Sequence, residues 1–331
     1  MNPHLYYLHR ISPFVIRFGE SFGLRWYGLS YVAGFAAGFL LLRYLSKRGR
    51  LQLTAHDLDE LMTVLIVGVL VGARLGYVLF YAPSLLVQFS SSPPFWGALA
   101  INQGGMSSHG GFIGVAIAVY YFARRRKVSW LHVGDAVVMV APVGLFFGRI
   151  ANFINGELYG CPTNAPWAVC FPSEIMNWSG ERLSQLTLLL TQNGFHFDKV
   201  ESILTAIRVN DAVAAIAHPL LTPRHPSQLY EAFLEGVVLF CLLWFFGVKK
   251  NVRPGAATAL FFFFYALLRI AGEQFREPDA DIGYQWLNLT RGQWLSIFML
   301  GAAAVFWRLS RTVRPAAAKA PNARFRPPKS H

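Results

Sequence analysis

The stretch VVMVAPVGLFFGRIANFINGELYG, residues 137–160, joins an apolar run to a polar one. Its first half is typical of a helix that crosses a lipid bilayer. Arg149, Asn152, Asn155 and Glu157 then follow in what should be the last turns of that helix. Ionisable groups are costly at membrane depth and usually face a bundle interior or a cavity. The stretch therefore predicts a membrane-spanning helix that carries part of a polar site near one end.

The composition of the whole chain is that of a membrane protein. Of its 331 residues, 54% are hydrophobic and only 14% are charged, and the mean hydropathy is +0.38. Soluble domains carry roughly 25% charged residues. The composition disfavours an ordinary soluble protein and predicts an all-α polytopic membrane protein.

Several apolar runs are long enough to cross the bilayer, which takes about 20 residues. They cover 26–45, 61–82, 97–123, 131–155, 228–247, 255–275 and 292–308. The third run is interrupted by NQGGMSSHGG. In the second run, Gly68, Gly72 and Gly76 recur every four residues, which predicts close helix packing. We therefore expect a transmembrane domain of seven helices over residues 1–308.

Basic residues predict how these helices are oriented. More than half of the 30 lysines and arginines fall in the loop 43–60, in 124–127, in 249–253 and in the tail from Arg308. Basic loops stay in the cytoplasm, so the N-terminus is expected outside and the C-terminus inside. This signal, together with attraction to anionic lipid, accounts for the +13 net charge without a nucleic-acid partner. The N-terminal segment lacks the pattern of a cleaved signal peptide, so the first helix is expected to insert uncleaved.

Two segments lie outside the helix pattern. Residues 156–227, between the fourth and fifth helices, begin polar and turn-rich and end amphipathic, which predicts a small extracytoplasmic head domain. Residues 309–331 are rich in Ala, Pro and Arg and are expected to be a disordered cytoplasmic tail. Cys161 and Cys170 fall in the head, on the oxidising side, where a disulfide is one alternative and two free thiols the other. Cys241, in the fifth helix, is read as a small apolar filler.

Ionisable residues inside the predicted helices are few: Arg74, His109, Asp135, Arg149, Arg269 and Glu273. Arg149 lies roughly 27 Å and Arg269 roughly 20 Å from the cytoplasmic ends of their helices, in a core of about 30 Å. Arg149 shares a helix face with Asn152, and Arg269 shares one with Glu273 and Arg276. Guanidinium groups bind phosphate oxygens in a bidentate manner. Two arginines in the outer half of the bilayer therefore suggest a phosphate clamp.

Structural explanations compete with each of these assignments. Arg269 and Glu273 have the spacing of a self-neutralising ion pair. Arg149 has the length to reach the outer headgroups from its helix. His109, which lies among glycines that would let a ligand approach the backbone, has the alternative of being a hydrogen-bonded packing residue. Arg74 and Asp135 are interpreted as structural.

At these residues the sequence resembles the prolipoprotein diacylglyceryl transferase family. The opening stretch fits the family signature at Gly148, Arg149, Asn152, Phe153, Ile154, Asn155, Glu157 and Gly160. Four other segments agree in the same order: LRWYGLSY (24–31), SSHGGFIG (107–114), RHPSQLYEAFLEG (224–236) and RIAGEQFREPDA (269–280). The resemblance extends over residues 8 to 300 and is less clear in 161–222 and in the tail.

The resemblance implies an activity and the residues that carry it. Such enzymes move the diacylglyceryl group of phosphatidylglycerol to the thiol of a lipobox cysteine in a prolipoprotein signal peptide, and they release glycerol phosphate. It implies a bacterial inner-membrane enzyme with its site in the periplasmic half. The catalytic residues implied are His109, Arg149 and Arg269. The substrate-binding residues implied or suggested by spacing are Tyr27, Arg149, Asn152, Glu157, Gly160, Arg269, Glu273 and Arg276.

The chemistry of this reaction suits those residue types. The leaving group is a phosphate oxyanion of low basicity, so charge stabilisation by the two arginines suffices. The nucleophile has to be a thiolate, and free cysteine has a pKa near 8.5. His109 as general base and a thiol pKa lowered by the arginines are two alternatives that the sequence leaves open. No metal or redox cofactor is expected.

Two other classes of function remain possible on the sequence. One is an anion or lipid transporter that uses the arginine pair on a permeation path, although internal repeats are not evident. The other is a lipid-binding scaffold without catalysis. Both classes would account for charged residues inside the predicted helices. A lipidation assay distinguishes them from an enzyme.

Overall fold

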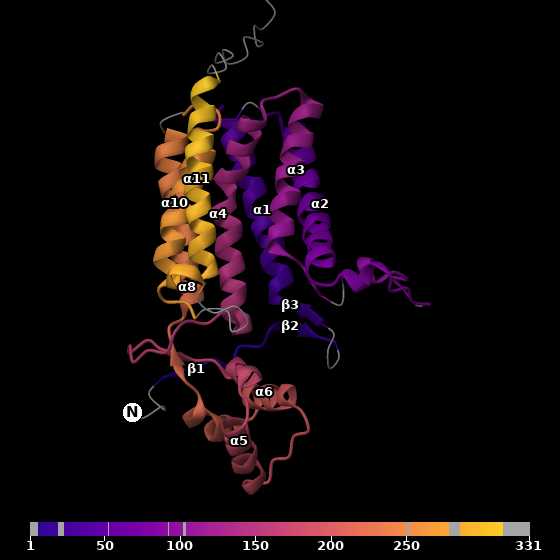
Figure 1. The fold of residues 1–331 in the computed structure, drawn as a ribbon, viewed down its shortest axis with the longest axis vertical. Helices are drawn as coiled ribbons and strands as arrows, with labels where there is room; N and C mark the ends of the chain where they lie inside the picture. The colour runs from indigo at the N-terminus through magenta and orange to yellow at the C-terminus, as the bar shows by residue number, and fades with distance from the viewer. Residues whose placement is uncertain are drawn as a thin grey trace, which may run out of the picture. The chain divides into compact units, whose positions relative to one another are not determined.

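The protein is mostly helical (Figure 1), in a computed structural model that describes residues 6–18, 23–51, 53–91, 93–101, 104–249, 252–277 and 285–313. Six helices in these residues are long and apolar enough to cross a membrane. They are α1 (Trp26–Lys47), α2 (Ala55–Phe80), α4 (Trp130–Asn155), the helix Ser227–Val248, α10 (Ala256–Glu273) and α11 (Arg291–Thr312). A multi-pass helical membrane protein is therefore confirmed.

The third predicted span differs from the expectation. Helix α3 (Ser108–Arg126) has only 19 residues and begins at Ser108, because Ser107 caps it by accepting a hydrogen bond from the Gly110 N–H. Gly104 and Gly105, just before it, have φ of +85° and +79°, a left-handed conformation that ends any helix there. Glycines and a final run of three arginines also make α3 less apolar than the other six helices.

The last helix is longer than predicted. Helix α11 continues to Thr312, so its final turn takes the first residues of the predicted tail. The rest of that tail, 314–331, lies outside the described residues.

The helix Ser227–Val248 is not a regular α-helix. It consists of α8 (Ser227–Glu231), the π-helical stretch η7 (Ala232–Val238), α9 (Leu239–Leu243) and a second π-helical stretch, η8 (Trp244–Lys249). π-Helical turns are rare and occur frequently at functional sites. Two acidic residues, Glu231 and Glu235, lie at the start of this irregular stretch.

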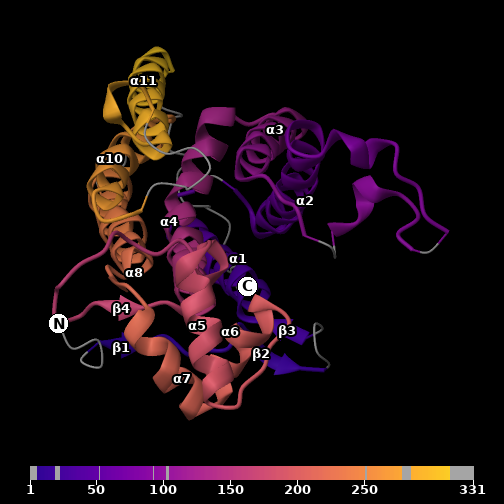
Figure 2. The same ribbon diagram turned by 60° about the horizontal axis from the view of Figure 1, so that its bottom comes forward.

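The described chain divides into two compact units, and the second comprises 38–140, 245–260 and the residues from 304 onward. Within it α2 and α3 lie side by side (Figures 1 and 2). Gly68, Gly72 and Gly76 of α2 meet Gly110 and Gly114 of α3 so closely that added Cβ atoms would clash with backbone. The predicted close packing is confirmed, and Gly110 is one of the glycines that it requires.

Two buried charges of this second unit have structural roles, as predicted. Arg74 donates to the carbonyl oxygens of Gly97, Ala98, Gly104 and Gly105 at 2.6–2.9 Å. Asp135 accepts from the N–H groups of Gly255 and Thr258 at 2.7 and 2.8 Å, which satisfies donors at the start of α10.

The first unit comprises 1–37, 141–244 and 261–303, and it contains the segment between α4 and α8. Helices α5 (Glu181–Gln192), α6 (Val200–Val209) and α7 (Asp211–Ala217) pack around a buried apolar cluster that includes Ile175, Leu186, Leu190 and Ile207.

A small sheet accompanies these helices, with the order β1 (Tyr7–Leu8), β4 (Val169–Cys170), β5 (Pro223–Arg224). Figure 2 shows β1 and β4 beside α5–α7. The N-terminal strand therefore belongs to the same layer as 156–227. A separate hairpin is formed by β2 (Phe14–Arg17) and β3 (Gly23–Arg25).

The alternative of a disulfide between Cys161 and Cys170 is wrong for this structure, because both thiols are free. Strand β5 lies between them: Arg224 pairs with Val169 on one side and with Pro162 on the other. Two strand spacings amount to about 10 Å, whereas a disulfide needs Cα atoms within about 7 Å. Burial raises the pKa of the Cys170 thiol to about 12 and also raises that of Cys161.

Candidate functional site

Arg149 of α4 and Arg269 of α10 are brought together by two carboxylates that the sequence analysis did not assign. The Arg149 guanidinium lies 3.0 Å from Glu231 and 3.1 Å from Glu235. The Arg269 Nη1 lies 2.7 Å from Glu231 and 3.0 Å from Glu235. Each carboxylate thus bridges both arginines. We call Arg149, Arg269, Glu231 and Glu235 the bridged arginine pair.

The glutamates of the bridged arginine pair are more deeply buried than its arginines. The side chains of Glu231 and Glu235 are 0% exposed, whereas those of Arg149 and Arg269 are 15% and 12% exposed. A guanidinium has five N–H donors, more than these contacts use, so donors remain on both arginines. The carboxylates are therefore fully enclosed, whereas each arginine side chain keeps a small exposed part.

Three more residues extend the pair into a larger network. Glu273 contacts the Arg269 Nη2 at 2.9 Å and accepts a 3.0 Å hydrogen bond from the Thr290 hydroxyl. Arg276 lies 3.6 Å from Glu231. The ion pair expected from the spacing of Arg269 and Glu273 is thus present, and the whole network holds three arginines against three glutamates. This balance makes burial of the charges tolerable.

Close helix packing places the carboxylates beside Arg149. Gly236 follows Glu235, and a Cβ added there would lie 2.7 Å from the Phe146 Cβ of α4. Because Gly236 has no side chain, the π-helical stretch η7 approaches α4 one turn before Arg149. The guanidinium of Arg149 consequently points into the protein, which excludes the interpretation that it only reaches for the headgroups.

Other predicted site residues on α1 and α4 form a second group of contacts. The Asn152 amide donates to the Glu157 carboxylate at 2.7 Å and lies 3.4 Å from the Tyr27 hydroxyl. The Gln228 amide donates to the Glu157 carbonyl at 2.6 Å. Asn152, Glu157 and Tyr27 therefore lie together, and Gln228 ties them to the helix that carries Glu231.

Gly160 has a packing reason to be glycine. Its N–H donates to the His225 carbonyl at 2.9 Å, and it forms a β-bridge with Arg276. A Cβ at this position would clash with the carbonyl oxygens of His225 and Phe275. Burial lowers the pKa of the His225 imidazole. Contact of Gly160 with substrate stays a prediction.

His109 is not part of these contacts. It belongs to the second unit, in the first turn of α3, and its side chain is half-buried. The structure therefore brings together Tyr27, Arg149, Asn152, Glu157, Gly160, Arg269, Glu273 and Arg276 in one unit and places His109 in the other.

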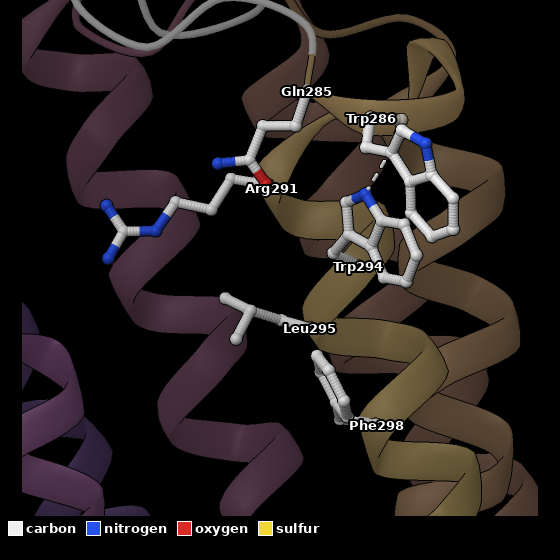
Figure 3. A pocket seen from close by; sticks show the side chains of 6 residues that line it. All are labelled: Gln285, Trp286, Arg291, Trp294, Leu295 and Phe298. Atoms are coloured by element: carbon white, nitrogen blue, oxygen red, sulfur yellow. Dashed lines mark hydrogen bonds between the residues drawn. The ribbon is translucent and has the colours of Figure 1, made fainter.

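An open surface pocket of about 400 Å³ lies at the start of α11, where Trp286 and Phe298 are largely exposed. Figure 3 shows its lining of stacked Trp286 and Trp294 rings, Leu295 and Phe298, with Gln285 and Arg291 as its polar groups. Thr290, next to Arg291, donates to the Glu273 carboxylate, and a Cβ added at Gly292 would lie 2.6 Å from the same carboxylate. An apolar cavity with an arginine thus adjoins the charged network.

The sequence contained a signal for the two missed carboxylates. Glu231 and Glu235 fall within the apolar run 228–247, and acidic residues at that depth are functional candidates by the same argument as Arg149. Their spacing of four residues also placed them on one helix face.

Comparison with known proteins gives consistent results. The family model described as prolipoprotein diacylglyceryl transferase matches residues 13–309. A phosphatidylglycerol–prolipoprotein diacylglyceryl transferase of Bdellovibrio bacteriovorus is 44% identical, with 88% of this chain and 90% of the relative covered. Proteins with the same name from Rhodospirillum rubrum and Nitrosomonas europaea are 40% and 38% identical. They cover 93% and 95% of this chain, and 95% and 97% of their own lengths.

Proposed function

The chain belongs to the prolipoprotein diacylglyceryl transferase family, and we propose that it transfers the diacylglyceryl group of phosphatidylglycerol to the lipobox cysteine of prolipoproteins. The observation that carries this proposal is the bridged arginine pair. Two guanidinium groups with free donors, held by buried carboxylates, suit a phosphate group better than any neutral ligand.

We place the protein in the inner membrane of a bacterium, with seven helices, the N-terminus outside and the C-terminus in the cytoplasm. Helix α3 is added to the six spans as a seventh, between α2 and α4. Its final arginines stay on the cytoplasmic side with the other basic loops. Residues 156–227 then form a periplasmic head, and the bridged arginine pair lies in the periplasmic half. The helices that carry these charges, α4, α8 and α10, are labelled in Figure 1.

In the reaction, the lipobox thiolate attacks the sn-3 carbon of the diacylglyceryl group. A carbon–sulfur bond forms, the carbon–oxygen bond to phosphate breaks, and the oxygen leaves with the electron pair as glycerol phosphate. Arg149 and Arg269 hold the phosphate and stabilise the charge that develops on that oxygen, with the low dielectric of the site strengthening the effect. Preorganisation by Glu231 and Glu235 means that the arginines need not reorient during the step.

The thiol proton has two possible acceptors. His109 is the side chain suited to general-base catalysis near neutral pH. The alternative is that the arginines lower the thiol pKa and water takes the proton. The pH dependence of a His109 variant separates the two.

The cavity at α11 fits a phospholipid as substrate. Its aromatic and aliphatic walls suit an acyl chain, and it adjoins the network at Glu273 (Figure 3). A charged site beside an apolar cavity is what an amphiphile with an anionic headgroup requires.

The function is tested with purified protein in detergent, phosphatidylglycerol and a lipobox peptide. The peptide should gain the mass of one diacylglyceryl unit, and glycerol phosphate should appear in equal amount. A peptide with serine in place of the cysteine should be inert, and a zwitterionic lipid should support little turnover. If the peptide gains no mass while the protein moves an anionic solute across liposomes, a transporter is the better description.

A further inference from the structure

Arg224 lies at the centre of a second charged cluster, which the mechanism does not use. Its Nε donates to the Glu174 carboxylate at 2.8 Å, and its Nη1 donates to the Gly160 carbonyl at 3.2 Å and to the Glu277 carboxylate. Glu174 is 2% exposed and also accepts from the Thr222 N–H at 2.9 Å. The guanidinium of Arg224 is therefore fixed from behind by a buried carboxylate.

The groups that Arg224 holds flank Arg276 on both sides. Glu277 follows Arg276 in the chain, and Gly160 forms the β-bridge with Arg276. In addition, the Cys161 N–H donates to the Phe275 carbonyl at 2.9 Å, and the Cys161 thiol donates to the Arg276 carbonyl at 3.2 Å. We call residues 160–161 with 275–277 the Arg276 edge.

We propose that Arg224 is a positioning residue that clamps the Arg276 edge and thereby holds the Arg276 side chain at Glu231, beside the bridged arginine pair. The clamp itself does not depend on the proposed function, and only its predicted effect on turnover rests on that function. The clamp is formed by one guanidinium that bonds both strands of the edge, which an ammonium cannot do with the same geometry.

Arg182 supplies a matched control for Arg224. It also contacts Glu174, at 3.2 Å, but it is 41% exposed, and its other hydrogen bonds go to Leu220 and Thr222. Arg182→Lys therefore perturbs the same buried carboxylate without touching the Arg276 edge. Glu277→Gln removes a charge from the edge at a side chain that is 39% exposed. Of the edge variants, it is therefore the one expected to destabilise the fold least.

The native cysteines report directly on the edge. Cys161 is bonded within it, and Cys170, buried in the apolar cluster of the same unit, reports on the fold. We would follow maleimide labelling of each cysteine by peptide mass spectrometry in wild type, Arg224→Lys, Glu277→Gln and Arg182→Lys. Opening of the edge should accelerate labelling of Cys161 by roughly tenfold in the first two variants, as loss of a charge-assisted bond allows. Cys170 should stay protected in all four proteins.

Turnover is then measured on the same samples. The two edge variants should lose roughly tenfold in kcat/KM for phosphatidylglycerol, and Arg182→Lys should match wild type. An unchanged Cys161 rate in both edge variants would overturn the clamp, as would equal acceleration of Cys161 and Cys170 in Glu277→Gln. Because labelling does not depend on transfer, a protein without transferase activity could still show the clamp, and the two proposals fail separately.

Discussion

Two arginines, one in each unit, show opposite uses of the same side chain. Arg74 directs its guanidinium at four backbone carbonyls and is 5% exposed, so nearly all its donors are used by the chain itself. Within the described residues, Arg149 makes its ion pairs with Glu231 and Glu235, and its side chain is 15% exposed. The arginine bonded to carbonyls stabilises a loop, whereas the one beside buried carboxylates is the one that we propose binds phosphate.

Replacing the arginines of the bridged arginine pair should have the largest effect on activity. Arg149→Lys keeps the charge but loses the planar fork, and we expect a loss of roughly 10²-fold or more in transfer rate. The variant should insert and fold at wild-type levels, which detergent size-exclusion chromatography can check. Activity within about threefold of wild type would remove the basis for a phosphate clamp.

His109 tests whether the second unit contributes to the chemistry. If it is the general base, His109→Gln should lose on the order of 10²-fold in rate near neutral pH. The defect should shrink as pH rises, because the peptide thiol then ionises unaided. A rate deficit that is independent of pH would point instead to a role in positioning.

Arg74→Met should affect stability and leave the chemistry largely intact. Four carbonyls lose their donor, of which that of Ala98 is buried and the other three are partly buried. An unsatisfied buried group costs about 1–3 kcal/mol, so thermal stability in detergent should fall. Activity per folded molecule should change by less than about fivefold, as expected for a residue outside the site. A fully stable but inactive Arg74→Met variant would contradict the assignment of a structural role to Arg74 and of ligand binding to Arg149.

The prediction with no expected effect near neutral pH concerns His9, which packs against the rings of Phe153 and Phe171 at 5.3 Å. Burial lowers the pKa of His9 to about 4. The unfolded chain, with a pKa near 6.5, binds the proton more readily, so stability is unaffected above about pH 6.5 and falls by roughly 3 kcal/mol as pH drops to 4. His9→Phe should flatten this acid limb in thermal melts, and an unchanged limb would exclude His9 as its cause.

Much of the fold could be predicted from the sequence because membrane helices are encoded locally. Apolar runs located α1, α4 and α10 to within a few residues. The start of α3 was misplaced because the predicted span continued across NQGGMSSHGG, whereas the helix begins only after Gly104 and Gly105 within that stretch. Strands of two residues, such as β1 and β4, have no periodicity to detect, and their pairing joins parts of the chain far apart in sequence.

The site was predictable only in part. Arg149 and Arg269 stood out as charges in apolar runs, but their partners Glu231 and Glu235 were not assigned a role, although they lie in a predicted span and in the segment RHPSQLYEAFLEG. The disulfide alternative failed for a different reason: spacing along the chain does not reveal that β5 lies between Cys161 and Cys170. Both failures concern which segments become neighbours, and that is fixed by tertiary packing.

The central claim is that Arg149 and Arg269 act as one phosphate site, and a double-mutant cycle tests it most directly. We would measure kcat/KM for phosphatidylglycerol in Arg149→Lys, Arg269→Lys and the double variant, each normalised to folded protein. The effects of residues that act as a unit are strongly non-additive. The double variant should therefore have nearly the same kcat/KM as the less active of the two single variants. Losses that multiply in full would show that the two arginines act independently and would contradict the account.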